Sequence, residues 1–211
     1  MEGKIMKQVA KDLLSIKAVT LSPEEPFTWA SGIKSPIYCD NRLTISYPEV
    51  RKRIAKGIAD IIREKYPETE VIAGTATAGI PHAAWIAEEL NLPMIYVRSK
   101  PKDHGRGKQI EGVLAEGQKV VLIDDLLSTG GSVLKAVDAA KNEGADVLGV
   151  CGIFSYQLSK LDDNFKVYNL SYATLTNYTE LIEVAEENDY IEEKQKEILH
   201  AWRKDPENWL K

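Results

Sequence analysis

One stretch decides the fold of this chain: Val120-Val121-Leu122-Ile123-Asp124-Asp125-Leu126-Leu127-Ser128-Thr129-Gly130-Gly131-Ser132. It opens on an unbroken apolar run, mostly β-branched, which is the pattern of a strand buried on both faces of a parallel sheet. Two carboxylates stand at the carboxyl end of that strand. A tight loop of hydroxyls and glycines then leads into a helical pattern of apolar residues. The stretch therefore predicts an α/β fold with a central parallel sheet flanked by helices.

The acid pair, Asp124 and Asp125, and the loop of residues 128–132 point to one kind of ligand. Carboxylates accept hydrogen bonds from sugar hydroxyls or share a metal ion with them, and backbone N–H groups at a helix start favour a phosphate. A ribose 5-phosphate satisfies both halves. The alternative is a buried strand that ends in a solvated acid pair before an ordinary capped helix. A P-loop is excluded, because no Gly-Lys-Ser/Thr follows the glycines.

This stretch resembles the ribose-phosphate loop of type I phosphoribosyltransferases, enzymes that use 5-phosphoribosyl 1-pyrophosphate (PRPP). The resemblance implies that the acid pair holds the ribose hydroxyls and that the loop grips the 5′-phosphate. The PRPP-binding residues expected here are Asp124, Asp125, Leu126, Leu127, Ser128, Thr129, Gly130, Gly131 and Ser132.

Length and composition favour one globular domain. The chain has 211 residues, of which 44% are hydrophobic and 28% charged, and its formal net charge is -5. This size allows a well-buried core with a small accessory lobe. The acidic balance gives no argument for nucleic acid as a partner. With no bilayer-length apolar run and no recognisable signal peptide, we expect no membrane contact and a cytoplasmic protein. Cys39 and Cys151 lack metal-type or disulfide-type spacing and are expected to be free thiols.

The first 45 residues are expected to form a helix and a small hood above the carboxyl edge of the sheet. Apolar residues recur at helical spacing from about Met6 to Lys17, which predicts an amphipathic helix. Further along, the alternation in Phe27-Thr28-Trp29 predicts a strand, and Ser31-Gly32 predicts a turn.

Lys34 follows this turn, and composition alone makes it an ordinary solvated lysine. However, the stretch Phe27-Thr28…Ser31-Gly32-Ile33-Lys34-Ser35-Pro36 resembles the segment of orotate phosphoribosyltransferases that lies over the base site. In that family its lysine reaches the anionic substrates, which implies that Lys34 binds orotate. Tyr38 is either an aromatic face for the base or a packed core tyrosine.

A second loop of small residues, Gly74-Thr75-Ala76-Thr77-Ala78-Gly79, follows a predicted strand over 71–73 and precedes a helix opening at Ile80-Pro81. Small residues let a ligand approach the backbone closely, and a helix start favours an anion. The alternative is a tight turn that needs small residues for packing. In the resembled family this loop contacts pyrophosphate, which implies that Thr75 and Ala76 bind PRPP. Many members carry a lysine at the position of Ala78, so backbone amides are the donors expected here.

Residues 98–108 form a basic segment in an acidic chain, directly after a strand predicted over Pro93–Val97. Its cationic residues are Arg98, Lys100, Lys102, Arg106 and Lys108, and His104 could add a further charge. The alternative is a solvated basic loop with no role in a site. The glycines and Pro101 fit a lid instead, and the carboxyl end of a strand is where open α/β sheets bind ligands.

The basic segment also resembles the catalytic loop of orotate phosphoribosyltransferases, with its Arg-x-x-x-Lys-x-His-Gly pattern. Arg98, Lys102 and His104 match that pattern, and the resemblance implies that all three contact PRPP. Many members have a second lysine where this chain has Ser99, and Lys100 is the candidate substitute. The catalytic residues implied are Arg98, Lys100, Lys102, His104 and Asp124. In the family this loop closes over the neighbouring subunit's site, which implies a homodimer.

A strand is predicted over Val147–Ile153, after a helix that Gly144 stops, and Tyr156 and Gln157 follow it. Some family members place an arginine hereabouts to hold the orotate carboxylate, but no arginine stands here. The orotate-binding set expected is Lys34, Ser128 and Tyr156, with the Ser128 hydroxyl and backbone amides near Lys34 as candidates for carboxylate recognition.

The C-terminal part predicts one more strand over Val167–Tyr172 and helices over Tyr178–Glu187 and Glu192–Trp202. These elements are expected to pack a domain edge or a dimer surface rather than to do chemistry. The division expected is a single phosphoribosyltransferase domain over 1–211, with the hood at 1–45, the α/β core at 46–175 and the C-terminal helices at 176–211.

The resemblance implies magnesium-dependent transfer of the 5-phosphoribosyl group from PRPP to orotate, giving orotidine 5′-monophosphate and pyrophosphate, in pyrimidine biosynthesis. Mg²⁺ is expected to be held through PRPP, with Asp124 and Asp125 as the candidate protein contacts. One alternative is a phosphoribosyltransferase for another base, against which the Lys34 segment and the lid pattern argue. The other is a non-enzymatic, PRPP-sensing regulator that binds RNA or DNA, against which the lid cations and the acidic charge argue.

Overall fold

The computed structural model describes residues 2–29, 31–101 and 108–210. Its helices are α1 (Glu2–Ser15), the 3₁₀ helix η1 (Asn41–Ser46), α2 (Pro48–Lys65), α3 (Gly79–Leu90), α4 (Gly131–Asn142), α5 (Ser159–Val167), α6 (Tyr178–Glu187) and α7 (Glu193–Lys204). Its strands are β1 (Val19–Leu21), β2 (Phe27–Thr28), β3 (Lys34–Ser35), β4 (Ile37–Cys39), β5 (Val71–Thr75), β6 (Met94–Val97), β7 (Ile110–Glu111), β8 (Lys119–Leu127), β9 (Asp146–Ser155) and β10 (Ser171–Asn177).

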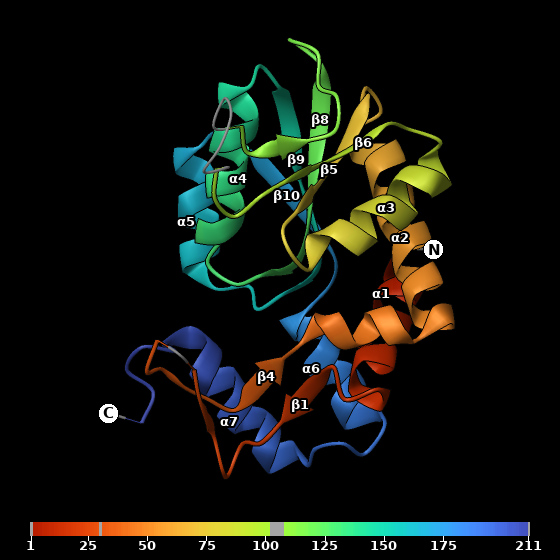
Figure 1. The fold of residues 1–211 in the computed structure, drawn as a ribbon. Coiled ribbons are helices and arrows are strands. Elements are labelled where there is room, and N and C mark those ends of the chain that lie inside the picture. The colour runs from red at the N-terminus through yellow and green to blue at the C-terminus, as the bar shows by residue number, and fades with distance from the viewer. Residues whose placement is uncertain (1, 30, 102–107, 211) are drawn as a thin grey trace.

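A central sheet organises the chain, with the strand order β10-β9-β8-β5-β6-β7 (Figure 1). Every neighbouring pair is parallel except β6 and β7, which form an antiparallel hairpin at the edge. Helices α1, α2 and α3 cover one face, and α4 and α5 cover the other (Figure 1). The predicted α/β fold with a central parallel sheet flanked by helices is therefore confirmed, and the antiparallel edge strand β7 is an addition to it.

Strand β8 shows why its sequence has no polar alternation. Val121 and Ile123 lie in the hydrophobic cluster under α1, α2 and α3, whereas Val120 and Leu122 lie in the cluster under α4 and α5. All four side chains are fully buried. Because successive side chains of a strand point to opposite faces, a strand covered on both sides must be apolar at every position.

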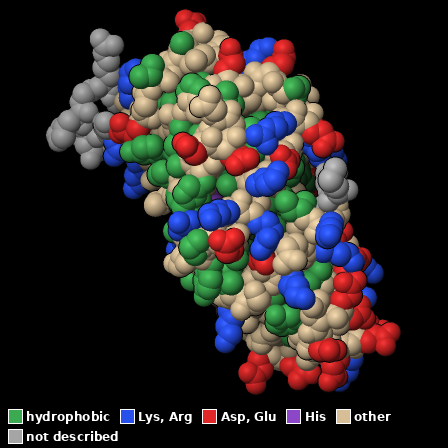
Figure 2. Space-filling view, turned by 90° about the vertical axis from the view of Figure 1, so that its right-hand side faces the viewer, with side chains coloured by type: hydrophobic (Ala, Val, Ile, Leu, Met, Phe, Trp, Pro, Cys, Tyr) green, Lys and Arg blue, Asp and Glu red, His purple; other side chains and the backbone are tan. Residues whose placement is uncertain are grey.

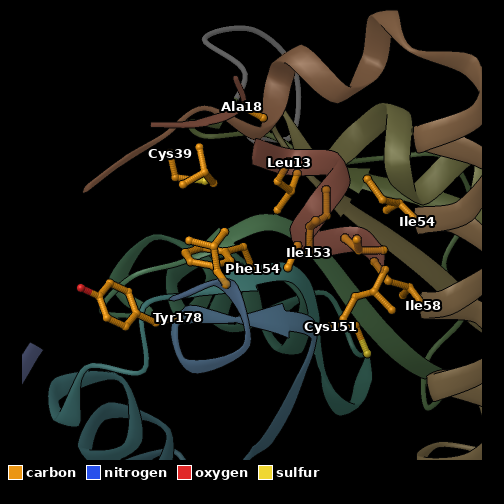
Figure 3. Packing of buried hydrophobic residues seen from close by; sticks show 14 of the residues in the cluster. Leu13, Ala18, Cys39, Ile54, Ile58, Cys151, Ile153, Phe154 and Tyr178 are labelled. Atoms are coloured by element: carbon orange, nitrogen blue, oxygen red, sulfur yellow. The ribbon is translucent and has the colours of Figure 1, made fainter. Parts of the chain in front are cut away.

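Helix α2 is formed where the sequence predicts it. Pro48 is well placed at the first turn, and Ile54, Ile58 and Ile62 follow at spacings of four residues. These side chains are buried, and Figure 3 shows Ile54 and Ile58 facing Cys151 and Ile153 of β9. The stripe thus fastens α2 to the sheet.

Several predicted boundaries differ from those of the structure. The strand predicted over Val167–Tyr172 begins only at Ser171, because α5 continues to Val167 and a turn with a positive φ at Asn169 separates the two elements. Strand β8 does not stop at Ile123 but pairs with β9 as far as Leu127. Helix α1 starts at Glu2, before the first strongly periodic residues.

Segments from both ends of the chain build the part that lies below the sheet in Figure 1. There β1 pairs with β4, β2 pairs with β3, and Trp202 of α7 packs with its ring 5.6 Å from that of Trp29. Helix α1 instead packs against α6, β10 and α2, on the face of the sheet. The N-terminal strands and the last helix therefore share one aromatic core.

The two cysteines are free thiols, as the sequence predicts. Cys39 and Cys151 are free and buried, and burial raises the pKa of both thiols. Acidic and basic side chains are interspersed on the face shown in Figure 2. No helix within 2–29, 31–101 and 108–210 is long and apolar enough to cross a bilayer.

His82 of α3 is a buried imidazole beside η1, and its charge state couples folding to pH. The Thr44 hydroxyl donates to the Asn41 carbonyl at 2.6 Å, so it accepts from His82 Nε2 at 3.2 Å. The other ring nitrogen, Nδ1, has no hydrogen-bond partner among the residues described. Burial lowers the pKa of His82 to about 4, because charging this ring would bury an uncompensated cation.

We expect the stability of the protein to fall between pH 6.5 and pH 4 because of His82. In that window the unfolded chain binds a proton that the folded chain refuses, which costs the folded state about 3 kcal/mol at the acid end. Urea unfolding of His82→Gln should show a shallower loss of stability on acidification than the parent, with His200→Gln as the matched control. Parallel pH profiles for His82→Gln and the parent would contradict this expectation.

Candidate active site

Asp124 and Asp125, the acid pair, lie near the carboxyl end of strand β8. This edge of the sheet contacts the N-terminal segment through Asn41. Thr75, at the end of β5, donates its hydroxyl to Asp124 Oδ1 at 2.9 Å and lies 3.0 Å from the carbonyl oxygen of Ile123. The backbone N–H of Asp125 donates to the same Asp124 oxygen at 2.9 Å. These contacts fix the Asp124 carboxylate and leave that of Asp125 without a cation in direct hydrogen-bond contact among the residues described.

Burial raises the pKa of Asp124, and burial together with the negative charge of Asp124 raises the pKa of Asp125 to about 7. Two carboxylates in one partly dehydrated site oppose each other's ionisation. Such a pair gains from hydroxyl donors or a divalent cation, and perturbed carboxylates at a sheet edge mark a candidate functional site.

Asn41 joins the acid pair to the N-terminal strands, a role that the sequence analysis missed. Its side-chain amide donates to the backbone oxygen of Asp125 at 2.6 Å, and its own carboxamide oxygen lies 3.3 Å from the Cys39 thiol. Asn41 is fully buried. The signal available in the sequence was weak, because Asn41 is the middle one of three polar residues that follow the apolar run Ile37-Tyr38-Cys39.

The loop of residues 128–132 leads from β8 into α4 as predicted. Gly130 precedes the helix with φ of +79°, and a side chain there would meet the ring of Phe165 at 2.8 Å. Gly130, the N-cap of α4, has no side chain to cap it, and the first N–H groups of a helix have no partner within the helix, so they can bind an anion. Leu127 is fully buried, so of that residue only the backbone can contact a ligand.

The loop of residues 75–79 lies against β8. A side chain at Gly79 would come within 2.4 Å of the carbonyl oxygen of Ile123, so only glycine fits there. The backbone N–H of Ala76 donates to the carbonyl of Val97 at 2.8 Å. This amide is therefore occupied in the sheet, and the Thr75 hydroxyl is occupied by Asp124, which weakens the prediction that these two residues donate to PRPP.

The basic segment connects the two strands of the β6–β7 hairpin. Arg98 N–H donates to the carbonyl of Gln109 at 2.8 Å, and the Arg98 guanidinium lies 3.8 Å from Glu111. Lys100 is exposed. Lys102 and His104, the predicted catalytic residues of this segment, lie outside the described residues. Strand β7 was missed because it spans two residues in a polar stretch.

Lys34 lies on the exposed side of the β2–β3 hairpin, where its ammonium donates to the Thr28 hydroxyl at 2.7 Å. The indole N–H of Trp202 donates to the Lys34 carbonyl at 3.0 Å. The C-terminal helix α7, which we expected to do no chemistry, therefore helps to position a predicted site residue. Tyr38 is 46% exposed, with its ring 5.8 Å from that of Phe27, which favours an aromatic face over a core role.

Tyr156 lies in the aromatic core rather than at the surface. Its side chain is 3% exposed, and its ring packs 5.1 Å from Trp29 and 5.3 Å from Phe154. This burial gives no support to the predicted contact with orotate. Ser128, whose hydroxyl is a predicted contact of the orotate carboxylate, is half-buried and lies three residues after Asp125.

The residues present fit a metal ion that takes most of its ligands from a substrate. Among the residues described, no three acidic, histidine or cysteine side chains converge as a metal cage. The two carboxylates of the acid pair are hard oxygen donors of the type that Mg²⁺ accepts, usually alongside water and phosphate oxygens.

Comparison with known proteins agrees with this geometry. A phosphoribosyl transferase domain family matches residues 46–187. Orotate phosphoribosyltransferases of Enterococcus faecalis and Lactiplantibacillus plantarum are both 64% identical to this chain, over 99% and 98% of each sequence. Among solved structures, UMP synthase of Leishmania donovani superposes with a TM-score of 0.80 at 26% identity, over 94% of this chain and 42% of that one.

Orotate phosphoribosyltransferase of Aeropyrum pernix superposes with a TM-score of 0.73 at 23% identity, over 87% of this chain and 99% of that one, which supports the fold. The fold is thus that of the type I phosphoribosyltransferases. Since the E. faecalis relative matches almost from end to end at high identity, the chain belongs to the orotate phosphoribosyltransferase family.

Proposed function

We propose that the site at the carboxyl end of β8 transfers the 5-phosphoribosyl group of PRPP to N1 of orotate, giving orotidine 5′-monophosphate and pyrophosphate. The observation that carries this proposal is the half-buried acid pair followed, five residues later, by a helix whose N-cap is the glycine Gly130. Asp124 and Asp125 accept hydrogen bonds from the ribose hydroxyls, and the amides of residues 128–132 bind the 5′-phosphate.

The proposed mechanism depends on where charge develops in the transition state of phosphoribosyl transfer. The bond between the anomeric carbon and the pyrophosphate oxygen breaks, and its electron pair leaves with pyrophosphate. Orotate N1, which gives up its proton, forms the new bond to the anomeric carbon. Positive charge grows on the ribose ring as this happens, and the fixed carboxylate of Asp124 eases it.

The leaving pyrophosphate needs cations, and the basic segment supplies them in this proposal. Lys102 stabilises the transition state, His104 donates a proton or hydrogen bond to pyrophosphate, and Arg98 and Lys100 add positive charge. Closure of this segment would exclude water, which strengthens each of these interactions. Mg²⁺, bound through PRPP with the acid pair nearby, would neutralise charge on the pyrophosphate.

A homodimer in the cytoplasm belongs to the same proposal. On η1 and the residue after it, Leu43 is 41% and Tyr47 is 44% exposed, and both lie on the segment that contains Asn41. Large apolar side chains left in water beside a site favour a protein interface. We propose that the partner's basic segment reaches this site.

The reaction is tested by following orotate absorbance with PRPP, Mg²⁺ and the purified protein, with pyrophosphate release measured in parallel. Loss of the orotate band with an equal yield of pyrophosphate is expected. Uracil and hypoxanthine replace orotate in control runs. Pyrophosphate release with one of those bases alone would leave the fold intact and refute the substrate, whereas PRPP binding without turnover of any base would favour a sensor.

A further inference from the structure

Orotate brings a carboxylate to a site that already holds two, so a cation must offset the repulsion. We propose that Arg42 binds the carboxylate of orotate and so selects orotate over uncharged pyrimidines. This inference rests on the proposed function. It names a residue of η1 that the sequence pattern did not single out.

Arg42 is placed beside the acid pair by its neighbour. Asn41 is tied to the Asp125 backbone at 2.6 Å, so the first turn of η1 lies over the end of β8. The positive charge of Arg42 opposes the burial and the Asp124 charge that raise the pKa of Asp125, and Tyr38 also lies within its field. Arg42 is thus a cation within electrostatic range of both the acid pair and the exposed side chain of Tyr38.

Asp40 holds the Arg42 guanidinium in one orientation and leaves some of its N–H donors unused. Arg42 Nε donates to Asp40 Oδ1 at 2.6 Å and Nη2 donates to Oδ2 at 2.7 Å. Asp40 is itself held as the cap of η1, where it accepts from the Arg42 backbone N–H. A guanidinium has five N–H donors, so the edge formed by Nη1 and the second Nη2 hydrogen remains for another carboxylate.

The exposure of Arg42 and the state of the other candidate residues support Arg42 as the carboxylate ligand. The Arg42 side chain is 65% exposed, so a ligand reaches it without rearrangement of the core. At the position where the family's arginine would stand, Tyr156 is buried and Gln157 accepts from both Arg203 and Thr179. Lys34 of β3 is a second exposed cation, but its ammonium is a point charge, whereas the fork of Arg42 matches the two oxygens of a carboxylate.

The test compares ligands that differ only in the carboxylate, orotidine 5′-monophosphate and uridine 5′-monophosphate, by calorimetry on the parent and Arg42→Gln. We expect Arg42→Gln to weaken binding of the orotidine nucleotide by on the order of 30-fold, as for a lost charged hydrogen-bond pair, and to leave the uridine nucleotide unchanged. The KM for orotate should rise by a similar factor, with kcat and the KM for PRPP nearly unchanged.

Arg42→Lys, which keeps the charge but not the fork, should recover part of the affinity. Arg63→Gln is the matched control, since Arg63 is an exposed arginine paired with Asp60 on α2. An unchanged preference for the orotidine nucleotide in Arg42→Gln overturns the inference, and so does an equal loss for both nucleotides. Absence of orotate turnover by the parent enzyme would instead refute the proposed function.

Discussion

Asp125→Asn is expected to weaken PRPP binding by on the order of a hundredfold while making the free protein more stable. The loss follows from removing a charged acceptor for ribose hydroxyls, at about 1.5–3 kcal/mol per charged hydrogen bond. The gain follows from the raised pKa of Asp125, caused by burial and by Asp124. An amide of the same shape carries no charge to desolvate.

The sign of the stability change depends on pH. Because the folded-state pKa of Asp125 is about 7, ionisation opposes folding increasingly as the pH rises from about 4, and the penalty is complete above about pH 7. At pH 8 the gain for Asp125→Asn is on the order of 2–4 kcal/mol, and it vanishes below pH 4.

Calorimetry with PRPP and thermal unfolding at pH 8 and pH 4 measure the two effects. Asp138→Asn, which changes an exposed carboxylate that accepts from the Tyr168 hydroxyl, controls for a change of net charge. Unchanged PRPP affinity in both Asp125→Asn and Asp124→Asn would remove the ribose assignment. A variant with a lower melting temperature at pH 8 would show that the acid pair is stabilising rather than strained.

Lys102→Ala is expected to lower kcat by on the order of a hundredfold or more, with a much smaller change in PRPP affinity. A cation that meets the leaving pyrophosphate interacts most strongly when the bond is breaking, so its loss appears in turnover rather than in ground-state binding. Lys108→Ala, which changes the last lysine of the same segment, 3.7 Å from Glu143, is the matched control. A nearly normal kcat in Lys102→Ala would exclude Lys102 from this role.

Mixing two impaired variants, assayed at a PRPP concentration far below the Kd of Asp125→Asn, tests whether the segment acts across a dimer. Lys102→Ala and Asp125→Asn each spoil a different half of the proposed shared site. Random reassociation of equal amounts should restore about a quarter of the parent activity, because half of the dimers are mixed and each carries one intact site. No recovery, with mixed dimers shown to form, would place Lys102 in its own subunit's site.

Local patterns in the sequence were sufficient for the elements that build the sheet. The apolar run Val120–Ile123 predicts a doubly buried strand, and the isoleucine stripe after Pro48 predicts α2, because each pattern reports burial of its own segment. The loop between β8 and α4 could also be recognised, since its acids, hydroxyls and glycines are adjacent in the chain.

Tertiary structure decided what depends on distant partners. Strand β8 continues through its two carboxylates because backbone hydrogen bonds with β9 offset the poor strand propensity of aspartate. Tyr156 was expected beside orotate, yet the rings of Trp29 and Phe154 enclose it. The residue type alone does not show whether an aromatic side chain will be buried by residues that are distant in the sequence.

The residues that position the candidate site residues also depend on tertiary structure. Asn41 reaches Asp125 across 84 residues of sequence, and Trp202 reaches Lys34 across 168. Local sequence periodicity predicted the strands and helices of the central sheet, and adjacent residue types marked the loop between β8 and α4. The placement of Asn41, Arg42 and Trp202 was decided only by the folded chain, because hydrogen bonds between distant segments form only after the hydrophobic core has brought those segments together.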